Sequence, residues 1–432
     1  MKYYSTKSEV IPVSFKEAIF KGLPDDNGLF MPESIPKLSE SFFERISEMT
    51  LPEIGLEVIK QYTEDEIPTD DLKKIIDETL AFEIPLKKIK KDVYSLELFH
   101  GPTLAFKDVG ARFLARSLSY FSASEDKKLT VLVATSGDTG SAVANGFYKV
   151  PNIDVVILYP SGKISDFQEQ QMTTLGGNIT ALEIDGTFDD CQKLVKQAFL
   201  DKKLSKEKNL TSANSINMAR LLPQSIYYFY AFAQLNDEQK KQAVFSVPSG
   251  NYGNISAGLL AQNMGLPISH FLACSNANDT VPKYLETSEY IAKPSVPTIS
   301  NAMDVGDPSN FVRMLDLFGD SHKQMKEAIT GYSFSDDETR ATITRVFEET
   351  EYVLDPHGAV AYLGLEDYLE TNSGTGIILE TAHPVKFAET VEKQIPQKMQ
   401  IPSHIQLTNL DKKSIAMSKD FESFKTFLEA KI

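Results

Sequence analysis

The chain has 432 residues with a formal net charge of −16, and 42% of its residues are hydrophobic. This length and composition are enough for two or three domains with real cores, and the acidic balance argues against nucleic acid or an anionic membrane surface as a partner. Two cysteines fit a reducing compartment, and six scattered histidines disfavour a transition-metal site. Because no apolar run approaches a membrane span and the first residues lack a signal peptide's apolar core, we expect a cytoplasmic protein with no membrane partner.

Residues 1–92 are predicted to form a mainly helical cap domain. Apolar residues recur with helical spacing in two segments, at Phe15, Ala18 and Ile19 and at Leu72, Ile75, Ile76 and Leu80. The lysine-rich segment 86–91 is equally consistent with a domain boundary and with a solvated strand edge.

From residue 93 onward, strands and helices are predicted to alternate. The expected strands are apolar runs that precede helical patterns or turns, at 93–99, 129–134, 154–159, 179–184, 243–247, 270–273 and 376–380. This alternation is typical of an α/β fold with parallel sheets covered by helices. Because a charged break at 201–209 separates two such series, we expect two sheet domains with a cleft between them.

The nine residues His100-Gly-Pro-Thr-Leu-Ala-Phe-Lys-Asp108 form the most informative segment. A Gly-Pro turn follows an apolar run, and Lys107 opens a helical pattern beside Phe106. Partial desolvation would lower the pKa of such an amine and free its lone pair for Schiff-base chemistry. The local pattern alone is more typical of a surface lysine whose stem covers Phe106.

Two glycine-rich turns each join a predicted strand to a predicted helix. They are Ser249-Gly-Asn-Tyr-Gly-Asn254 and Thr135-Ser-Gly-Asp-Thr-Gly-Ser141. Glycines let backbone amides approach an anion, and a helix N-terminus adds partial positive charge, so both turns are candidate anion sites. An ordinary βα turn and a pair of helix caps are the alternatives.

Two further residues are candidates for binding. Arg220 closes Asn214-Ser-Ile-Asn-Met-Ala-Arg220, where an arginine near Asn and Ser could clamp a phosphate, although these residues alone favour a helix-surface arginine. Thr381 ends an apolar strand, the position at which α/β sheets place ligands, although it could also cap the turn before Pro384. We disfavour His383 and Lys386 as contacts and expect His357 to be structural.

Taken in order, these segments resemble the threonine synthase family, in its bacterial and fungal branch. The family consists of pyridoxal-phosphate enzymes of fold type II. The resemblance also covers the N-terminal stretch and the segments Asn278-Asp-Thr-Val-Pro282, Ser300-Asn-Ala-Met-Asp304 and Thr381-Ala-His-Pro384. It implies two parallel-sheet domains with an N-terminal helical cap: residues 1–92 form the cap, 93–124 and 210–432 the large domain, and 125–209 a smaller inserted domain.

The resemblance also implies roles for individual residues. Lys107 would form the Schiff base with pyridoxal 5′-phosphate, and Asp138 would lie near the cofactor's 3′-oxygen. Other cofactor contacts would be Phe106, Gly250, Asn251, Tyr252, Gly253, Asn254 and Thr381, with Thr381 facing the ring nitrogen. Substrate contacts would be Thr103, Ser136 and Thr139, together with Asn214, Ser215 and Arg220 for the substrate's phosphate.

The implied reaction converts O-phospho-L-homoserine and water to L-threonine and phosphate through γ-elimination and β-addition. A phospholyase or a serine/threonine dehydratase, which would release a keto acid and ammonia, is the alternative within the same chemistry. A non-catalytic small-molecule binder that kept the fold is the alternative from another class. The sequence leaves open whether the protein is a monomer or a homodimer.

Overall fold

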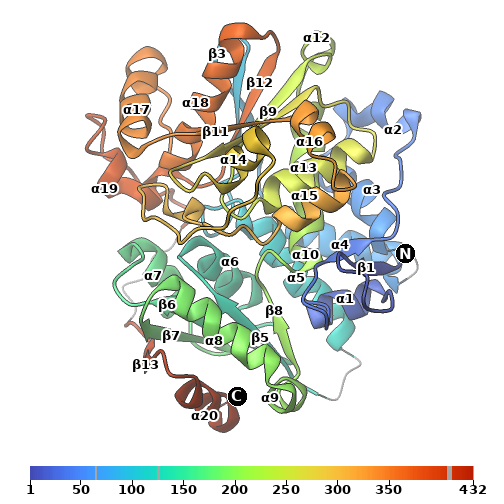
Figure 1. The fold of residues 1–432 in the computed structure, drawn as a ribbon, viewed down its shortest axis with the longest axis vertical. Helices are drawn as coiled ribbons and strands as arrows, with labels where there is room; N and C mark the ends of the chain where they lie inside the picture. The colour runs from blue at the N-terminus through green and yellow to red at the C-terminus, as the bar shows by residue number, and fades with distance from the viewer. Residues whose placement is uncertain (64–65, 124–126, 406–410, 432) are drawn as a thin grey trace.

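Two sheets organise the chain. The computed structural model describes residues 1–63, 66–123, 127–405 and 411–431. A six-stranded sheet lies in the upper part of Figure 1 and a five-stranded sheet in the lower part, while the N-terminal helices lie along one side. The predicted α/β class with two parallel sheets is confirmed.

The larger sheet has the strand order β11-β10-β9-β12-β4-β3. All its neighbouring strands run parallel except β3 and β4, which pair antiparallel. Its two central strands are buried at every position, which explains why their sequences are continuous apolar runs. The strands are β3 (Leu86–Lys90), β4 (Val93–Glu97), β9 (Ala243–Pro248), β10 (His270–Ser275), β11 (Ile329–Ser333) and β12 (Thr375–Glu380).

The smaller sheet has the order β13-β7-β6-β5-β8 and is entirely parallel. Its strands are β5 (Leu129–Ala134), β6 (Ile153–Pro160), β7 (Ile179–Asp185), β8 (Leu210–Ser212) and β13 (Ile415–Ser418). The helices that accompany it are α6 (Asp138–Phe147), α7 (Asp166–Thr173), α8 (Phe188–Leu200), α9 (Lys202–Glu207) and α20 (Phe421–Lys431). The chain therefore returns to the smaller sheet at its far end, where α20 lies at the bottom of Figure 1.

The strands of the two sheets do not follow the predicted domain division at three segments. It placed β3 in the cap, but β3 pairs with β4 at the edge of the larger sheet, so the strand-edge alternative for 86–91 was correct. It placed 210–212 and 415–418 in the large domain, but β8 and β13 form the two edges of the smaller sheet. Short edge strands carry little periodicity, and only pairing with a distant strand reveals to which sheet they belong.

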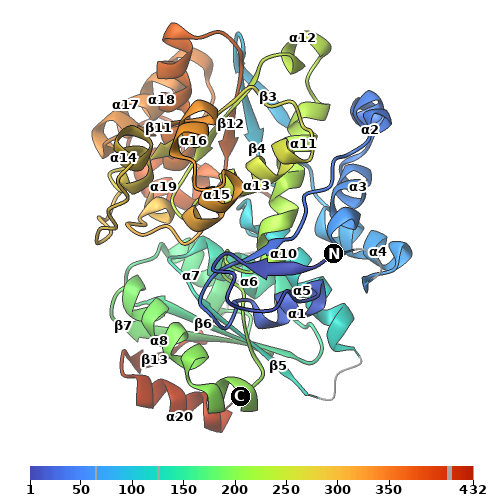
Figure 2. The ribbon, with the colours of Figure 1, turned by 45° about the vertical axis from the view of Figure 1, so that its right-hand side comes forward.

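The N-terminal region contains helices at both predicted segments. It comprises β1 (Tyr3–Ser5), α1 (Phe15–Lys21), β2 (Phe30–Pro32), α2 (Glu40–Arg45), η1 (Ile46–Glu48), α3 (Leu51–Thr63) and α4 (Thr69–Thr79). Ser14 and Glu17 form a capping box that starts α1. The other end of α1 is tied to the smaller sheet, because the carbonyl of Ile19 accepts hydrogen bonds from Thr211 and Asn217. Figure 2 shows β1 and α1 level with the junction of the two sheets.

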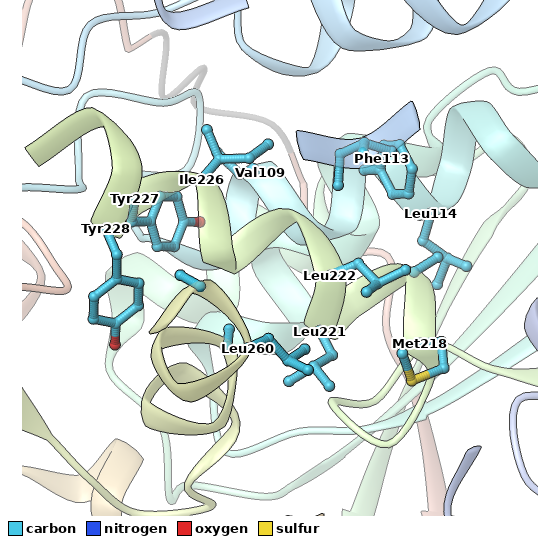
Figure 3. Packing of buried hydrophobic residues seen from close by; sticks show 14 of the residues in the cluster. Val109, Phe113, Leu114, Met218, Leu221, Leu222, Ile226, Tyr227, Tyr228 and Leu260 are labelled. Atoms are coloured by element: carbon cyan, nitrogen blue, oxygen red, sulfur yellow. The ribbon is translucent and has the colours of Figure 1, made fainter. Parts of the chain in front are cut away.

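A helical core supports that junction. Side chains of α5 (Lys107–Ser122), α10 (Met218–Leu221), α11 (Ser225–Ala233) and α13 (Gly253–Asn263) pack together, as Figure 3 shows for Phe113, Leu221, Ile226 and Leu260. The helix that begins with the candidate reactive lysine is therefore anchored along its buried face.

The remaining elements surround the larger sheet. They are η3 (Leu222–Gln224), α12 (Asp237–Lys240), α14 (Thr280–Thr287), η4 (Asn301–Met303), α15 (Phe311–Leu317), α16 (His322–Ala328), α17 (Asp336–Thr350), α18 (Pro356–Thr371), η5 (Pro384–Phe387) and α19 (Ala388–Val391). No helix in the described part of the chain is long and apolar enough to cross a membrane. The described residues also contain no cluster of three or more His, Cys, Asp or Glu side chains suited to a metal ion.

Candidate active site

A cavity of about 1380 Å³ lies where β5, β9 and β12 end. The carboxyl ends of parallel strands are the usual ligand-binding edge of an α/β sheet. Of the predicted site residues, the cavity wall includes Phe106, Lys107, Ser136, Thr139, Asn214, Ser215, Arg220, Gly250, Asn251, Tyr252, Gly253, Asn254 and Thr381. Segments far apart in the sequence thus meet around one space.

Lys107 is the first residue of α5 and faces this cavity. The pKa of Lys107 is lowered to about 8, mainly because its amine is buried; Asp138 opposes this shift, and the cations Arg220 and Lys386 contribute to it. Its Nζ lies 5.7 Å from the centre of the Phe106 ring. An amine with this pKa is substantially neutral near pH 8 and can act as a nucleophile.

The loop before Lys107 is held against the end of β12. The amide of Phe106 donates to the carbonyl of Thr381 at 2.9 Å, and the amide of His383 donates to the carbonyl of Leu104 at 3.0 Å. Tyr227 donates its hydroxyl to the carbonyl of Phe106. The position of Lys107 is therefore set by backbone pairing rather than by a flexible turn.

The turn from β9 into α13 has the shape of an anion site. Tyr252 adopts a left-handed conformation with φ 59° directly before α13 begins at Gly253, so the first amides of that helix lack partners within the helix. A Cβ on Gly250 would lie 2.5 Å from Cα of Met303, which only glycine avoids. Buried Asn254 leaves its Nδ2 without a partner in the described structure. A phosphate group would satisfy these donors.

The turn from β5 into α6 is a second candidate anion site. Thr135 accepts hydrogen bonds from the amides of Gly137 and Gly140 at 2.9 and 2.8 Å, which folds the turn back on itself. Ser136 and Thr139 then line the cavity beside the start of α6. A carboxylate or phosphate would find hydroxyls and unpaired helix amides there.

Asp138 lies behind this turn rather than on the cavity wall. Its Oδ1 forms an ion pair with the Nζ of Lys386 at 2.6 Å and accepts a hydrogen bond from Gln168 at 2.9 Å. Although burial opposes it, the positive charges of Lys386 and Lys107 hold the pKa of Asp138 at about 2. The side chain is therefore ionised near the candidate amine, and its charge is already matched by Lys386.

Arg220 carries a buried positive charge into the cavity wall. The side chain is 3% exposed, and its Nη1 donates to the carbonyl of Ala213. Nε has no partner in the described structure, and no carboxylate of the described residues forms an ion pair with the guanidinium. Burial lowers the pKa of Arg220 to about 10, so it stays protonated at neutral pH. An unmatched buried cation is costly, which suggests that an anionic ligand completes it.

Ser215 is prepared to donate a hydrogen bond. Its Oγ accepts hydrogen bonds from the side-chain Nδ2 atoms of Asn251 and Asn310 at 2.6 and 3.2 Å, which leaves its own hydrogen for the cavity. Asn214 ties the same loop to the end of β5 through a 2.9 Å bond to the carbonyl of Ala134. Together with Arg220, these residues form a third group of anion-binding donors.

Thr103 is not among the residues that line the cavity, and its role in substrate binding stays a prediction. Its hydroxyl donates to Asp108 at 2.5 Å and its amide donates to the same carboxylate at 2.9 Å. Its carbonyl accepts bonds from Lys386 and Gln171. Thr103 thus shapes the loop before Lys107, which the sequence could not distinguish from ligand contact because both uses favour a hydroxyl residue.

Several wall residues were not predicted. His357 lines the cavity next to η4, with its Nδ1 2.6 Å from Asp355 and its Nε2 accepting from the amide of Ala302. Asp304 is also on the wall, and burial raises its pKa to about 6 despite hydrogen bonds from Thr298 and Asn276. The N-terminal segment adds Phe20, Lys21, Leu23, Pro24, Asp25, Asn27 and Leu29. No motif in that segment indicated a position at the site.

The residues present therefore fit pyridoxal phosphate. Lys107 would hold its aldehyde carbon, the β9–α13 turn its phosphate, and the hydroxyl of Thr381 its ring nitrogen. The first two assignments depend on a nucleophilic amine and unpaired donors that the structure places on one wall.

Comparison with known proteins identifies the family. The model for the threonine synthase N terminus matches residues 2–80, the model for pyridoxal-phosphate dependent enzymes matches 78–379, and the model for the threonine synthase C-terminal region matches 358–428. The chain belongs to the threonine synthase family. Over 406 residues it is 46% identical to the threonine synthase of Escherichia coli K12, and the alignment covers 94% of each protein.

Solved structures of the threonine synthase family share the whole fold. The crystal structure of threonine synthase from Escherichia coli matches with a TM-score of 0.93 and 44% identity, covering 99% of both chains. The structure of PLP-bound threonine synthase from Brucella melitensis matches with a TM-score of 0.91 and 34% identity, covering 99% of this chain and 98% of the other. The chain is thus a pyridoxal-phosphate-dependent lyase of fold type II, as the resemblance implied.

Proposed function

We propose that this protein converts O-phospho-L-homoserine and water to L-threonine and inorganic phosphate. The observation that carries the substrate assignment is the buried guanidinium of Arg220, which has no carboxylate partner in the described structure and faces the same cavity as Lys107. A phosphate on the substrate's side chain would supply the missing anion. The β9–α13 turn would hold the cofactor's own phosphate.

The chain's own groups would divide the work as follows. Ser136, Thr139 and the first amides of α6 hold the substrate carboxylate, while Arg220, Ser215 and Asn214 hold the substrate phosphate. Pyridoxal phosphate, when bound, supplies the electron sink. The amine of Lys107, once released, takes the proton from the substrate's Cα and transfers protons at Cβ, for which a pKa of about 8 is well matched.

Product analysis tests this function. We expect purified enzyme given O-phospho-L-homoserine to release threonine and phosphate in equal amounts, with little ammonia. Keto acid and ammonia in place of threonine would assign a phospholyase or dehydratase instead. A cofactor spectrum that shifts with substrate, without release of phosphate, would assign a non-catalytic binder. A cytoplasmic location stays a prediction from the sequence, which leaves open whether the protein is a monomer or a homodimer.

A further inference from the structure

Lys386 lies outside the predicted set but next to the reactive lysine. It belongs to η5, a few residues after Thr381. Its side chain is fully buried and its Nζ makes two contacts, an ion pair with Asp138 at 2.6 Å and a hydrogen bond to the carbonyl of Thr103 at 2.9 Å. One buried ammonium thus joins the end of β12, the start of α6 and the loop that leads to Lys107.

Three charged side chains lie within electrostatic range of the amine of Lys107. Asp138 attracts a proton to it from α6, while Arg220 on α10 and Lys386 on η5 repel one. A buried carboxylate with two lysines in reach can pair with either of them. In this structure Asp138 pairs with Lys386, and Lys107 forms no ion pair with any described residue; its recorded contact is the ring of Phe106.

We propose that Lys386 is a positioning residue for the reactive amine: by holding Asp138 in its own ion pair, it keeps that carboxylate from pairing with Lys107. A lysine paired with a buried carboxylate stays protonated and has no lone pair with which to attack an aldehyde. Because of Lys386, the ionised Asp138 can lie near Lys107 without keeping that amine protonated. This inference rests on Lys107 as the reactive amine, which is part of the proposed function.

The second contact of Lys386 strengthens this role. Its hydrogen bond to Thr103 fixes the ammonium from the side of the loop, and Gln168 fixes Asp138 from the side of α7. Both partners of the ion pair are thereby held by additional bonds, which a buried pair needs to be stable. Neither group has to move when Lys107 reacts.

The test is a titration of Lys107 in the full-length chain freed of cofactor. The pH dependence of its acylation by acetic anhydride, followed by peptide mass spectrometry, reports the pKa of this amine without any turnover. In Lys386→Met, Asp138 loses its partner and we expect the pKa of Lys107 to rise by about one unit or more. Adding Asp138→Asn to Lys386→Met should reverse this rise in the pKa of Lys107. The variant Lys386→Arg keeps the positive charge, so its rise in the pKa of Lys107 should be smaller.

Asp138→Asn alone should shift the pKa of Lys107 downward, because the attraction is gone and Lys386 remains. This opposite sign keeps the proposal testable even if Lys386→Met does not fold. Lys90→Met is the matched control. Lys90, on β3, also forms an ion pair, with Glu366 at 2.9 Å, but it does not line the cavity. This variant should leave the titration unchanged.

Two results would overturn the proposal. One is an unchanged pKa of Lys107 in folded Lys386→Met, and the other is a rise that persists when Asp138→Asn is added. Failure of the proposed function would appear differently, as the absence of threonine from the product assay while the titration shifts as expected.

Discussion

At the scale of single residues, the site depends on which of its buried charges are paired with each other. Lys107, Asp138, Arg220 and Lys386 lie within electrostatic range of one another, yet the one ion pair among them in the described structure joins Asp138 to Lys386. The amine of Lys107 is thus not paired with a carboxylate that would keep it protonated, and the charge of Arg220 is left available to attract an anion. Burial strengthens both effects because it lowers the local dielectric.

Lys107 should react with pyridoxal phosphate in a manner that follows its lowered pKa. Below pH 8 the amine is mostly protonated, so the rate of cofactor incorporation should rise with pH and level off near 8 rather than near 10.5. Stopped-flow absorbance on the full chain freed of cofactor measures this rate. Lys107→Ala should abolish incorporation, and an adduct found at another lysine after borohydride reduction, or at none, would refute the assignment.

Arg220→Met should separate binding from stability. Loss of a charged hydrogen-bond donor to the substrate's phosphate should cost about 2–3 kcal/mol of transition-state stabilisation. This corresponds to a kcat/KM for the phosphorylated substrate that is lower by roughly 30-fold or more. Because the variant also removes an unmatched buried cation, its unfolding temperature should not fall. Arg340→Met on the exposed face of α17 is the control for loss of an arginine. A large drop in unfolding temperature would instead make Arg220 a structural residue.

At the scale of elements, three neighbouring strands and one turn of the other sheet build the site. β4 leads to the loop before Lys107, β12 ends next to Thr381, and β9 leads to the turn before α13. These three strands lie side by side in the order β9-β12-β4. The β5–α6 turn meets them from the smaller sheet. η4 then packs against the turn before α13 at Gly250.

Gly250→Ala should disturb this contact. The added Cβ would lie 2.5 Å from Cα of Met303, a backbone atom, so η4 or the turn must move. Overpacking of this kind costs about 1–3 kcal/mol, which we expect to appear as a tenfold or greater loss of cofactor affinity in a fluorescence titration. Gly253→Ala in the same turn is the matched control for fold stability, since its Cβ would meet Asn310 at an ordinary 3.4 Å. Equal unfolding temperatures and cofactor affinities for both variants would contradict this.

At the scale of the whole molecule, the two ends of the chain contribute to different parts of the structure. Residues near the N-terminus line the cavity. At the other end, β13 pairs with β7 and α20 packs on the smaller sheet, where Phe424 and Leu428 are fully buried with residues of α8. Lys425 adds an ion pair with Asp201 at 2.7 Å. The N-terminal segment thus contributes to the cavity wall, and the C-terminal helix contributes to the core of the smaller sheet.

Phe424→Ala should therefore destabilise the protein although it lies far from the site in sequence. Removing a fully buried phenylalanine costs about 3–5 kcal/mol, which thermal unfolding and limited proteolysis can detect. Phe427→Ala, on the same helix but only half-buried, should cost clearly less. Equal effects of the two changes would show that α20 does not dock as described.

The sequence by itself determined the class of fold and the two glycine-rich turns, whereas Lys107 was singled out only through the family resemblance. Each of these is a local pattern: strand and helix periodicity, or a turn that requires glycine, is written in adjacent residues. Its order of motifs also indicated the family. Thirteen of the candidate residues accordingly line one cavity.

Only the tertiary structure decided which sheet the edge strands join, where Thr103 points, and that Lys386 pairs with Asp138. These depend on contacts between residues far apart in the chain, such as the 2.6 Å pair between positions 138 and 386. The free energy of such a contact comes from burial and from the partner's charge, and neither is visible in the residues adjacent to either side chain.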